Sequence, residues 1–192
     1  METIILSTKH LHFTDQDFYT FCMDNPELKF ERTEDGKIII MANTGGTTGR
    51  LNAKLIFYLY KWNIDKNLGE VFDSSTAFLL PNKSVRSPDA AWISKGRWNA
   101  LSEEQKSKFP PICPDFIVEL KSTSDDLIDV QNKITNEWMN NGCKLAWLID
   151  PEQKYIYVYE NNKDFKILGE STKIMNFDIL PGLEFYLSEL FI

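Results

Sequence analysis

The sequence predicts a single α/β domain. Its 192 residues suffice for one domain with a sizeable core and are few for two. Short extended runs alternate with stretches of helical periodicity, and one such stretch, over residues 125–141, joins two buried strand-like runs. That succession indicates a right-handed βαβ unit. No repeat, low-complexity tract or linker divides the chain, so we predict one domain over residues 1–192.

The N-terminal region predicts a helix followed by a hairpin. Residues 13–22 carry apolar side chains at helical spacing, and Thr14 is a suitable N-cap residue. Two extended runs, 28–32 and 37–41, flank the segment 34–36, whose Asp-Gly pair is typical of a tight turn. The expected fold therefore begins with a helix and a β-hairpin.

The rest of the chain predicts two longer helices and the strands of the sheet. A glycine-rich loop over residues 43–49 leads into a helix from about Arg50 to Lys66. A surface excursion over residues 97–111 contains a short helix at 102–108, and Gly142 stops the helix of the βαβ unit. The runs predicted as strands are 69–73, 77–80, 89–93, 116–121, 144–149, 155–159, 165–168 and 171–175, and the last three are expected to continue the sheet.

Neither a membrane segment nor a signal peptide is expected. The longest apolar runs, such as residues 55–60, are far shorter than the roughly 20 residues that span a bilayer. The first six residues lack the basic segment and the small-residue cleavage site of a signal peptide. We therefore expect a cytoplasmic protein without a membrane partner.

The cysteines support the same compartment. Cys22, Cys113 and Cys143 are widely spaced and set among apolar residues, so we expect three reduced thiols in the core. No Cys-x-x-Cys pair occurs, and His10 and His12 belong to the N-terminal arm. A zinc site is therefore not expected.

The net charge bears on possible partners. Lys and Arg number 21 and Asp and Glu number 28, which gives a formal charge of −7. A negative chain is a poor non-specific ligand for nucleic acid, because such binding depends on neutralising phosphates. A local basic patch or a partner subunit could still supply the required field.

The run Phe116–Lys121 is the most informative part of the sequence. Because side chains alternate along a strand, Ile117, Glu119 and Lys121 share one face. A carboxylate and an ammonium fixed on a core strand are costly to bury. The pair is therefore either a structural ion pair or part of a site that binds a metal and polarises a reacting group.

Two carboxylates and a lysine on adjacent strands would suit a divalent cation and an activated water. Asp89 begins one predicted strand and Glu119 lies on the next, and the backbone carbonyl of Leu120 could supply a third oxygen for Mg²⁺. Lys121 could hold or polarise the attacking water. Asp115 competes with Asp89 because Pro-Asp occurs twice, but it lies roughly 13 Å from Glu119 along one strand, which is too far to share an ion.

Several motifs, in this order along the chain, resemble the Uma2 family of restriction-endonuclease-like proteins, which falls within the PD-(D/E)xK nuclease superfamily. The resemblance runs over nearly the whole chain. The segments that carry it are 30–31, 44–49, 86–93, 113–125, 142–151 and 180–182.

The resemblance implies a restriction-endonuclease-like core, which is a mixed central β-sheet flanked by helices. It also implies a Mg²⁺-dependent site at the edge of this sheet, where Mn²⁺ could substitute. It also implies hydrolysis of DNA phosphodiester bonds by a homodimer that uses no small-molecule cofactor. Asp89 and Glu119 would be metal ligands, and Lys121 the catalytic lysine. Glu31 would be an accessory carboxylate from the first hairpin, although a solvated strand charge is the alternative.

Two questions stay open at this point. Some relatives have another residue at the position of Lys121, and a basic residue of the following helix could replace it. Lys133 is a candidate, although its position favours a solvated helix residue. The second question is activity, because fold alone does not confer function. The chain could be a non-catalytic module that binds nucleic acid or protein, which suits its acidic charge, or a nuclease for RNA or branched DNA.

Overall fold

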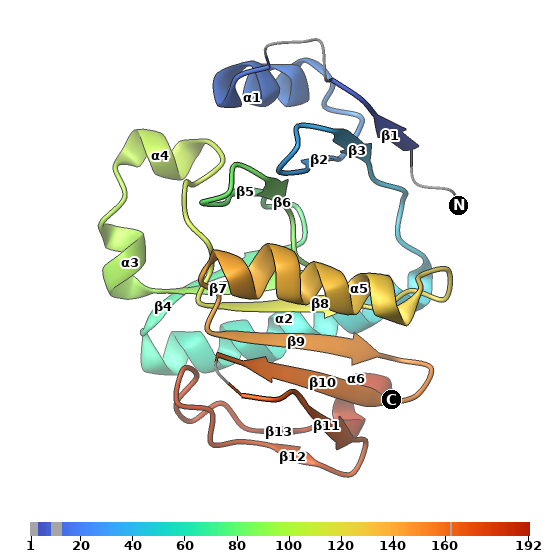
Figure 1. Cartoon of the computed structure of the whole chain (residues 1–192). Coiled ribbons are helices and arrows are strands. Elements are labelled where there is room, and N and C mark those ends of the chain that lie inside the picture. Colours follow the sequence, from blue (N-terminus) through green and yellow to red (C-terminus); the bar gives the residue numbers. More distant parts are fainter. Residues whose placement is uncertain (1–3, 9–12, 162) are drawn as a thin grey trace.

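The computed structural model describes residues 4–8, 13–161 and 163–192 (Figure 1). His10 and His12 lie outside these residues. The largest sheet is mixed, with six strands in the order β11-β10-β9-β8-β7-β4. These strands are β4 (Gly69–Asp73), β7 (Ala90–Ser94), β8 (Phe116–Leu120), β9 (Leu145–Asp150), β10 (Tyr155–Glu160) and β11 (Lys166–Gly169).

The sheet is mixed, as the family resemblance implies, because of its central pair. β8 and β9 run parallel, with Glu119 opposite Leu148, and α5 (Leu127–Lys133) connects them. The neighbouring pairs β7–β8 and β9–β10 are antiparallel. The predicted strand-helix-strand unit is therefore present, and it lies at the centre of the sheet.

Helices cover both faces of this sheet (Figure 1). Phe116, Val118 and Leu120 of β8 pack in one core cluster with the buried side of α2 (Gly46–Lys66). Ile117, from the opposite face of β8, packs in a second cluster with residues that follow α5. The alternation predicted along β8 is confirmed, and it leaves Glu119 on the α5 side.

A second, antiparallel sheet contains the predicted hairpin and lies apart from the main sheet (Figure 1). α1 (Asp15–Asp24) packs on it through Phe18, and Thr14 and Asp17 form the capping box that begins this helix. The strands of the second sheet, in the order β1-β3-β2-β6-β5, are β1 (Ile4–Leu6), β2 (Phe30–Arg32), β3 (Ile38–Ile40), β5 (Phe78–Leu79) and β6 (Val85–Arg86).

Two sequence predictions about element boundaries are wrong. α2 begins at Gly46, with Gly45 as its N-cap, instead of near Arg50. Glycine costs up to about 1 kcal/mol per helical position, but the buried packing of the later turns offsets this cost. The run 171–175 does not extend the main sheet; a turn after β11 leads into β12 (Lys173–Ile174), which pairs with β13 (Phe185–Tyr186).

Short helices complete the described chain. α3 (Lys95–Asn99) was not predicted, whereas α4 (Glu103–Ser107) lies within the predicted helix and is capped by Ser102. α6 (Ser188–Phe191) packs near the C-terminus. After α5 the helix continues as a π turn, η1 (Ile134–Trp138), and a 3₁₀ turn, η2 (Met139–Asn141).

The core also contains the three cysteines, which are free and buried as predicted. Among the described helices, none has the length and apolar character needed to cross a membrane.

Candidate active site

A cleft of about 900 Å³ opens where the second sheet, the start of α2 and the end of β8 meet. It also receives side chains from the segment after β8 and from α5. The charged residues on which the site depends all line it: Glu31, Arg86, Asp89, Glu119, Lys133 and Glu137.

Asp89 is fixed at the end of β8 by two backbone contacts. Its N–H donates to the carbonyl of Val118 at 2.9 Å, and its Oδ2 accepts the N–H of Leu120 at 2.7 Å. The Asp89 carboxylate therefore lies beside the residue that follows Glu119. Its Oδ1 takes no part in these contacts.

Glu119 is buried and is held through one oxygen. Its Oε1 accepts a hydrogen bond from Nε1 of Trp138 at 2.7 Å, and Nζ of Lys133 lies 3.0 Å from the same oxygen. Oε2 forms neither of these contacts. Two donors from the segment after β8 thus fix the side chain through Oε1, and Glu119 lines the cleft.

The π turn makes this double contact possible. Lys133 and Trp138 are five residues apart, and in a regular α-helix they would point about 140° away from each other. In η1 the N–H of Met139 donates to the carbonyl of Ile134, five residues earlier, as well as to the α-helical partner Thr135. A turn of this kind returns the fifth residue to the same face, and such turns are frequent at functional sites.

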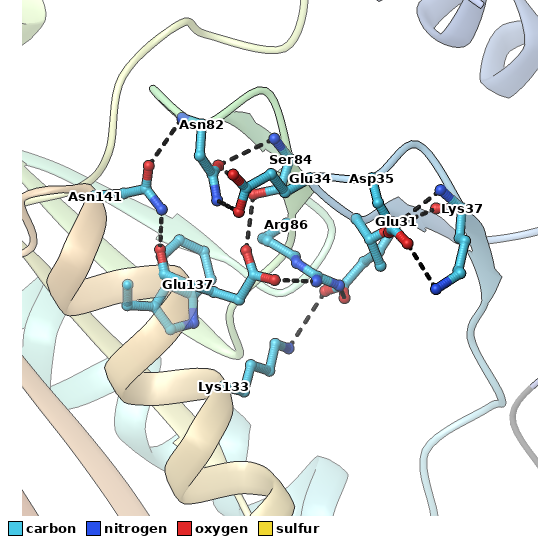
Figure 2. Close-up of polar contacts among 12 residues, drawn as sticks. Glu31, Glu34, Asp35, Lys37, Asn82, Ser84, Arg86, Lys133, Glu137 and Asn141 are labelled. Carbon is cyan, nitrogen blue, oxygen red and sulfur yellow. Dashed lines mark hydrogen bonds and ion pairs between the residues drawn. The ribbon is translucent and has the colours of Figure 1, made fainter. Parts of the chain in front are cut away.

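Glu31 lies opposite, on β2, and is almost fully buried. Its Oε1 accepts the N–H of Ser87 at 3.0 Å and lies 3.4 Å from Nζ of Lys133, and its Oε2 lies 3.0 Å from Arg86 (Figure 2). The interpretation of Glu31 as a solvated strand charge is wrong. Lys133 is shared between Glu31 and Glu119, so it links the two sheets across the cleft.

Arg86 extends the network to the helix side. Besides Glu31 it pairs with Glu137 of η1, and Glu137 also accepts a hydrogen bond from the Ser84 hydroxyl at 2.9 Å (Figure 2). Asn141 donates to the carbonyl of Glu137 at 2.8 Å. These contacts hold the β6 end of the second sheet against the π turn.

Burial raises the pKa values of the carboxylates in the cleft, whereas neighbouring cations lower them. Burial, with the negative charges of Asp89 and Glu31, raises the pKa of Glu119 to about 7, although Lys133 opposes the shift. Burial also raises the pKa of Asp89. For Glu31 the positive charges of Lys133 and Arg86 outweigh burial, and its pKa falls below the ordinary value. Burial disfavours the charge of Lys133, but Glu119 and Glu31 raise its pKa.

Lys121 is not brought to this cluster. Its Nζ lies 2.9 Å from Glu152 and 3.3 Å from the carbonyl of Ser122. β8 ends at Leu120, so the next side chain reaches the β9–β10 turn instead of the cleft. The expected pairing of Glu119 with Lys121, structural or catalytic, is therefore absent. Lys133 contacts Glu119 instead, so the view of Lys133 as a solvated helix residue is wrong.

Asp115, the competing Pro-Asp residue, lies at the opposite end of β8. Its carboxylate is fully buried, accepts the N–H of Ser94 at 2.9 Å, and pairs with Arg97 at 2.9 Å and Lys144 at 2.7 Å. Although burial opposes it, these partners lower the pKa of Asp115. The structure therefore separates the two Pro-Asp motifs, with Asp89 in the cleft and Asp115 in a balanced structural cluster.

Sequence reasoning missed three contributors. Trp138 fits the apolar stripe of the helix, so the sequence pattern predicted a core residue and gave no sign that its indole N–H donates a hydrogen bond. Arg86 stands three residues before Asp89, which is a weak signal by itself. Glu137 follows Lys133 at the i,i+4 spacing of a helical ion pair, yet Lys133 pairs with Glu31 and Glu119 and Glu137 pairs with Arg86.

The donor set suits a hard divalent cation. Asp89 and Glu119 each have one oxygen outside the contacts described above, and Leu120 also lines the cleft. Burial raises the pKa values of both carboxylates, and a bound cation would stabilise their charged forms. No cluster of three or more His, Cys, Asp or Glu side chains with metal-binding geometry occurs among the described residues. Any ion here would thus combine few carboxylates with backbone or water oxygens.

Comparison with known proteins agrees with this architecture. The profile of the Uma2 family, described as "Putative restriction endonuclease", matches residues 15–188. The chain therefore belongs to the Uma2 family. A crystal structure of a "putative nuclease belonging to DUF820" from Anabaena variabilis ATCC 29413 superposes with a TM-score of 0.72 at 18% identity, covering 86% of this chain and 90% of that one. The fold is therefore nuclease-like. No curated protein matches the chain.

Proposed function

We propose that the protein is a Mg²⁺-dependent endonuclease that hydrolyses DNA phosphodiester bonds. The observation that supports this most is the meeting of Asp89, Glu119 and Lys133 at one end of β8, in an open cleft. Membership in the Uma2 family, described as "Putative restriction endonuclease", supports this reaction class. Mn²⁺ would replace Mg²⁺, since both prefer oxygen ligands.

Each residue has a distinct role in this proposal. Oδ1 of Asp89, Oε2 of Glu119 and the carbonyl of Leu120 would hold the cation. When bound, the cation would supply an activated water and neutralise charge on the phosphate. Lys133 would stabilise negative charge on the substrate from its position beside Glu119, the role first assigned to Lys121.

Glu31 and Arg86 would act on the site through Lys133. Glu31 lies 3.4 Å from the ammonium of Lys133, while Arg86 fixes the far oxygen of Glu31 at 3.0 Å. Glu31 is thus an accessory carboxylate that orients the lysine and keeps it charged. Removing Glu31 would free Lys133 to pair with Glu119 alone.

The choice of DNA rests on the family, because the chemistry would also serve RNA or branched DNA. The formal charge of −7 opposes tight non-specific binding, so the cation itself would have to contribute to substrate affinity. We assign the enzyme to the cytoplasm because its three buried cysteines are free.

The test compares cleft carboxylates with a carboxylate outside the cleft. Asp89→Asn and Glu119→Gln should each reduce cleavage of plasmid DNA in Mg²⁺ by about 100-fold or more and abolish Mn²⁺ binding measured by calorimetry. Glu152→Gln, which alters the partner of Lys121, should cleave like the parent protein. EDTA should stop the reaction. Parent-level cleavage by both Asp89→Asn and Glu119→Gln would refute the assignment, and parallel assays on RNA and branched DNA define the substrate.

One observation favours the non-catalytic module instead. Arg86 and Lys133 already neutralise much of the carboxylate charge without a metal. In that case the parent protein would bind neither Mg²⁺ nor Mn²⁺ at millimolar concentration, and nucleic acid would bind without being cut. Calorimetric metal titration of the parent protein separates the two functions.

A further inference from the structure

The two walls of the cleft differ in charge. One wall is formed by the second sheet and the start of α2. Apart from Glu31 and Arg86, which pair with each other, Lys29 is the one charged residue that this wall contributes among the described residues lining the cleft. The opposite wall, formed by the segment after β8 and by α5, carries three aspartates, Asp125, Asp126 and Asp129. Because phosphates are attracted by cations and repelled by carboxylates, a nucleic-acid strand in the cleft would turn its backbone toward Lys29.

Lys29 is the cation of the cleft that no described carboxylate neutralises. Its Nζ donates to the carbonyl of Ser74 at 2.6 Å, and the residue is exposed. Arg86 and Lys133, by contrast, are both paired with carboxylates of the cleft. Burial raises the pKa of Asp89, and the charge of Lys29 is near enough to oppose that shift. Lys29 thus lies near a candidate metal ligand, with its positive charge available for a phosphate.

The helical segment of α5 and η1 presents two rows of side chains to the cleft. Lys133 and Glu137 form the deeper row, and both take part in the ion pairs described above. Asp129, Asn132 and Asn136 follow one another at spacings of three and four residues and form an exposed outer row. Neither asparagine amide has a hydrogen-bond partner within the described part of the chain. These amides are therefore available to a ligand.

The chemistry of the outer row suits base edges better than phosphates. The row contains no cation, and Asp129 would repel a phosphate. A carboxamide offers donors and an acceptor side by side, and asparagine uses both to bind adenine. Asn132 and Asn136 are about 6 Å apart along the helix, which is close to two base steps of about 3.4 Å. The two amides are therefore spaced to contact bases two steps apart on one strand.

We propose that the cleft orients the cleaved DNA strand, with Lys29 on its phosphate backbone and Asn132 and Asn136 on its base edges. This orientation rests on the proposed nuclease function and adds a preference for adenine at two positions beside the scissile phosphate. Lys29 holds a phosphate next to the one at Asp89 and Glu119, and the bases of the same strand face α5. Affinity and sequence preference thus arise on opposite walls and can be altered separately.

Binding of a duplex of fixed sequence tests the phosphate contact. Lys29→Met should weaken binding at least about threefold and should reduce the slope of log K against log salt by about 1. Fluorescence anisotropy measures both, with Ca²⁺ in place of Mg²⁺ to avoid cleavage. Lys37→Met is the matched control, because Lys37 is an exposed lysine of the same hairpin that pairs with Asp35 outside the cleft. Its affinity and salt slope should match those of the parent protein.

Selection from a randomised duplex library tests the base contacts. DNA bound by the parent protein in Ca²⁺ should show adenine preferred about 10-fold over each other base at two positions. Asn132→Ala and Asn136→Ala should each lose the preference at one of these positions while keeping the salt slope of the parent. Asn140→Ala is the control, because Asn140 is exposed on η2 but does not line the cleft, and its preference should be unchanged.

The outcomes separate this orientation from the nuclease function. Adenine preference that is lost in the two asparagine variants, in a protein that cuts no DNA, would support the orientation and refute the nuclease. Cleavage without base preference, or with a preference that both asparagine variants retain, would refute the orientation alone. So would a Lys29→Met protein that binds DNA as Lys37→Met does. A parent protein that binds no DNA would overturn both.

Discussion

The two ends of β8 carry the two Pro-Asp motifs, and they differ in charge balance. At the start of the strand, the single carboxylate of Asp115 contacts two cations, Arg97 and Lys144. At its end, the cleft gathers Glu31, Asp89, Glu119 and Glu137 around Arg86 and Lys133, and Lys29 also lines the cleft. The pKa of Asp115 is lowered, whereas those of Asp89 and Glu119 are raised.

This difference distinguishes a structural cluster from a binding site. A buried carboxylate with enough cations is stable without further ligands, whereas surplus carboxylates in an open cleft leave free energy for a bound cation to recover. The Pro-Asp motif therefore occurs once in a structural cluster and once in the cleft. The number of cations and carboxylates around each aspartate distinguishes the two.

The largest predicted effect concerns which lysine serves the cleft. Lys133→Met should reduce DNA cleavage by about 100-fold or more, because its ammonium contacts Glu119 and Glu31. Lys121→Met should stay close to the parent rate, since its ammonium contacts Glu152. Single-turnover cleavage rates measure both, with circular dichroism to show that Lys133→Met folds. The opposite ranking would restore Lys121 as the catalytic lysine.

Disrupting the cluster of Asp115, Arg97 and Lys144 should lower the free energy of unfolding. Asp115→Asn removes a fully buried charge from beneath Arg97 and Lys144, and we expect a loss of about 3 kcal/mol in the free energy of unfolding, measured in urea. The solvent exposure of both cations keeps the loss near the lower end of the range for buried pairs. Metal affinity should not change, and a fall in affinity would show that the two ends of β8 are coupled.

The two ends should also differ in pH dependence. The folded protein keeps a proton on Glu119 up to about pH 7, whereas the unfolded chain releases it near 4.5, so stability should fall as the pH rises through that window, by up to about 3 kcal/mol. Asp115 has a lowered pKa, so its contribution is present above pH 4 and is lost on acidification. Urea unfolding from pH 4 to 8 measures the slope.

Glu119→Gln provides the control for this pH dependence. The variant should show a smaller slope between pH 4.5 and 7, and saturating Mg²⁺ should flatten the slope in the parent protein only. An unchanged slope in Glu119→Gln would assign the effect to another group.

The smallest effect is expected at the ion pair of Lys121. Glu152 is half exposed, and exposed pairs contribute little, so Glu152→Gln should change the free energy of unfolding by less than about 1 kcal/mol. Thermal unfolding at low and high salt measures it. A larger loss would mean that the pair fixes the β9–β10 turn and, through it, the end of β8.

Much of the fold follows from local patterns. The buried runs of β8 and β9 and the capping box of α1 were readable because hydrophobic alternation and N-cap chemistry are properties of neighbouring residues. The hairpin β2–β3 could also be predicted from the sequence, but its pairing within a second sheet could not. That pairing depends on Arg32 of β2 meeting Val85 of β6, more than 50 residues later.

The sequence by itself determined the α/β class, the face of β8 that carries Glu119, and the separation of Asp115 from Glu119, because side-chain alternation and the rise per residue of a strand follow from spacing. Only the tertiary structure decided that Lys133 replaces Lys121 beside Glu119 and that Glu31 is buried. The physical reason is the π turn, which shifts the helix by part of a turn and brings Lys133 and Trp138 to one carboxylate. No regular periodicity in the sequence encodes that shift.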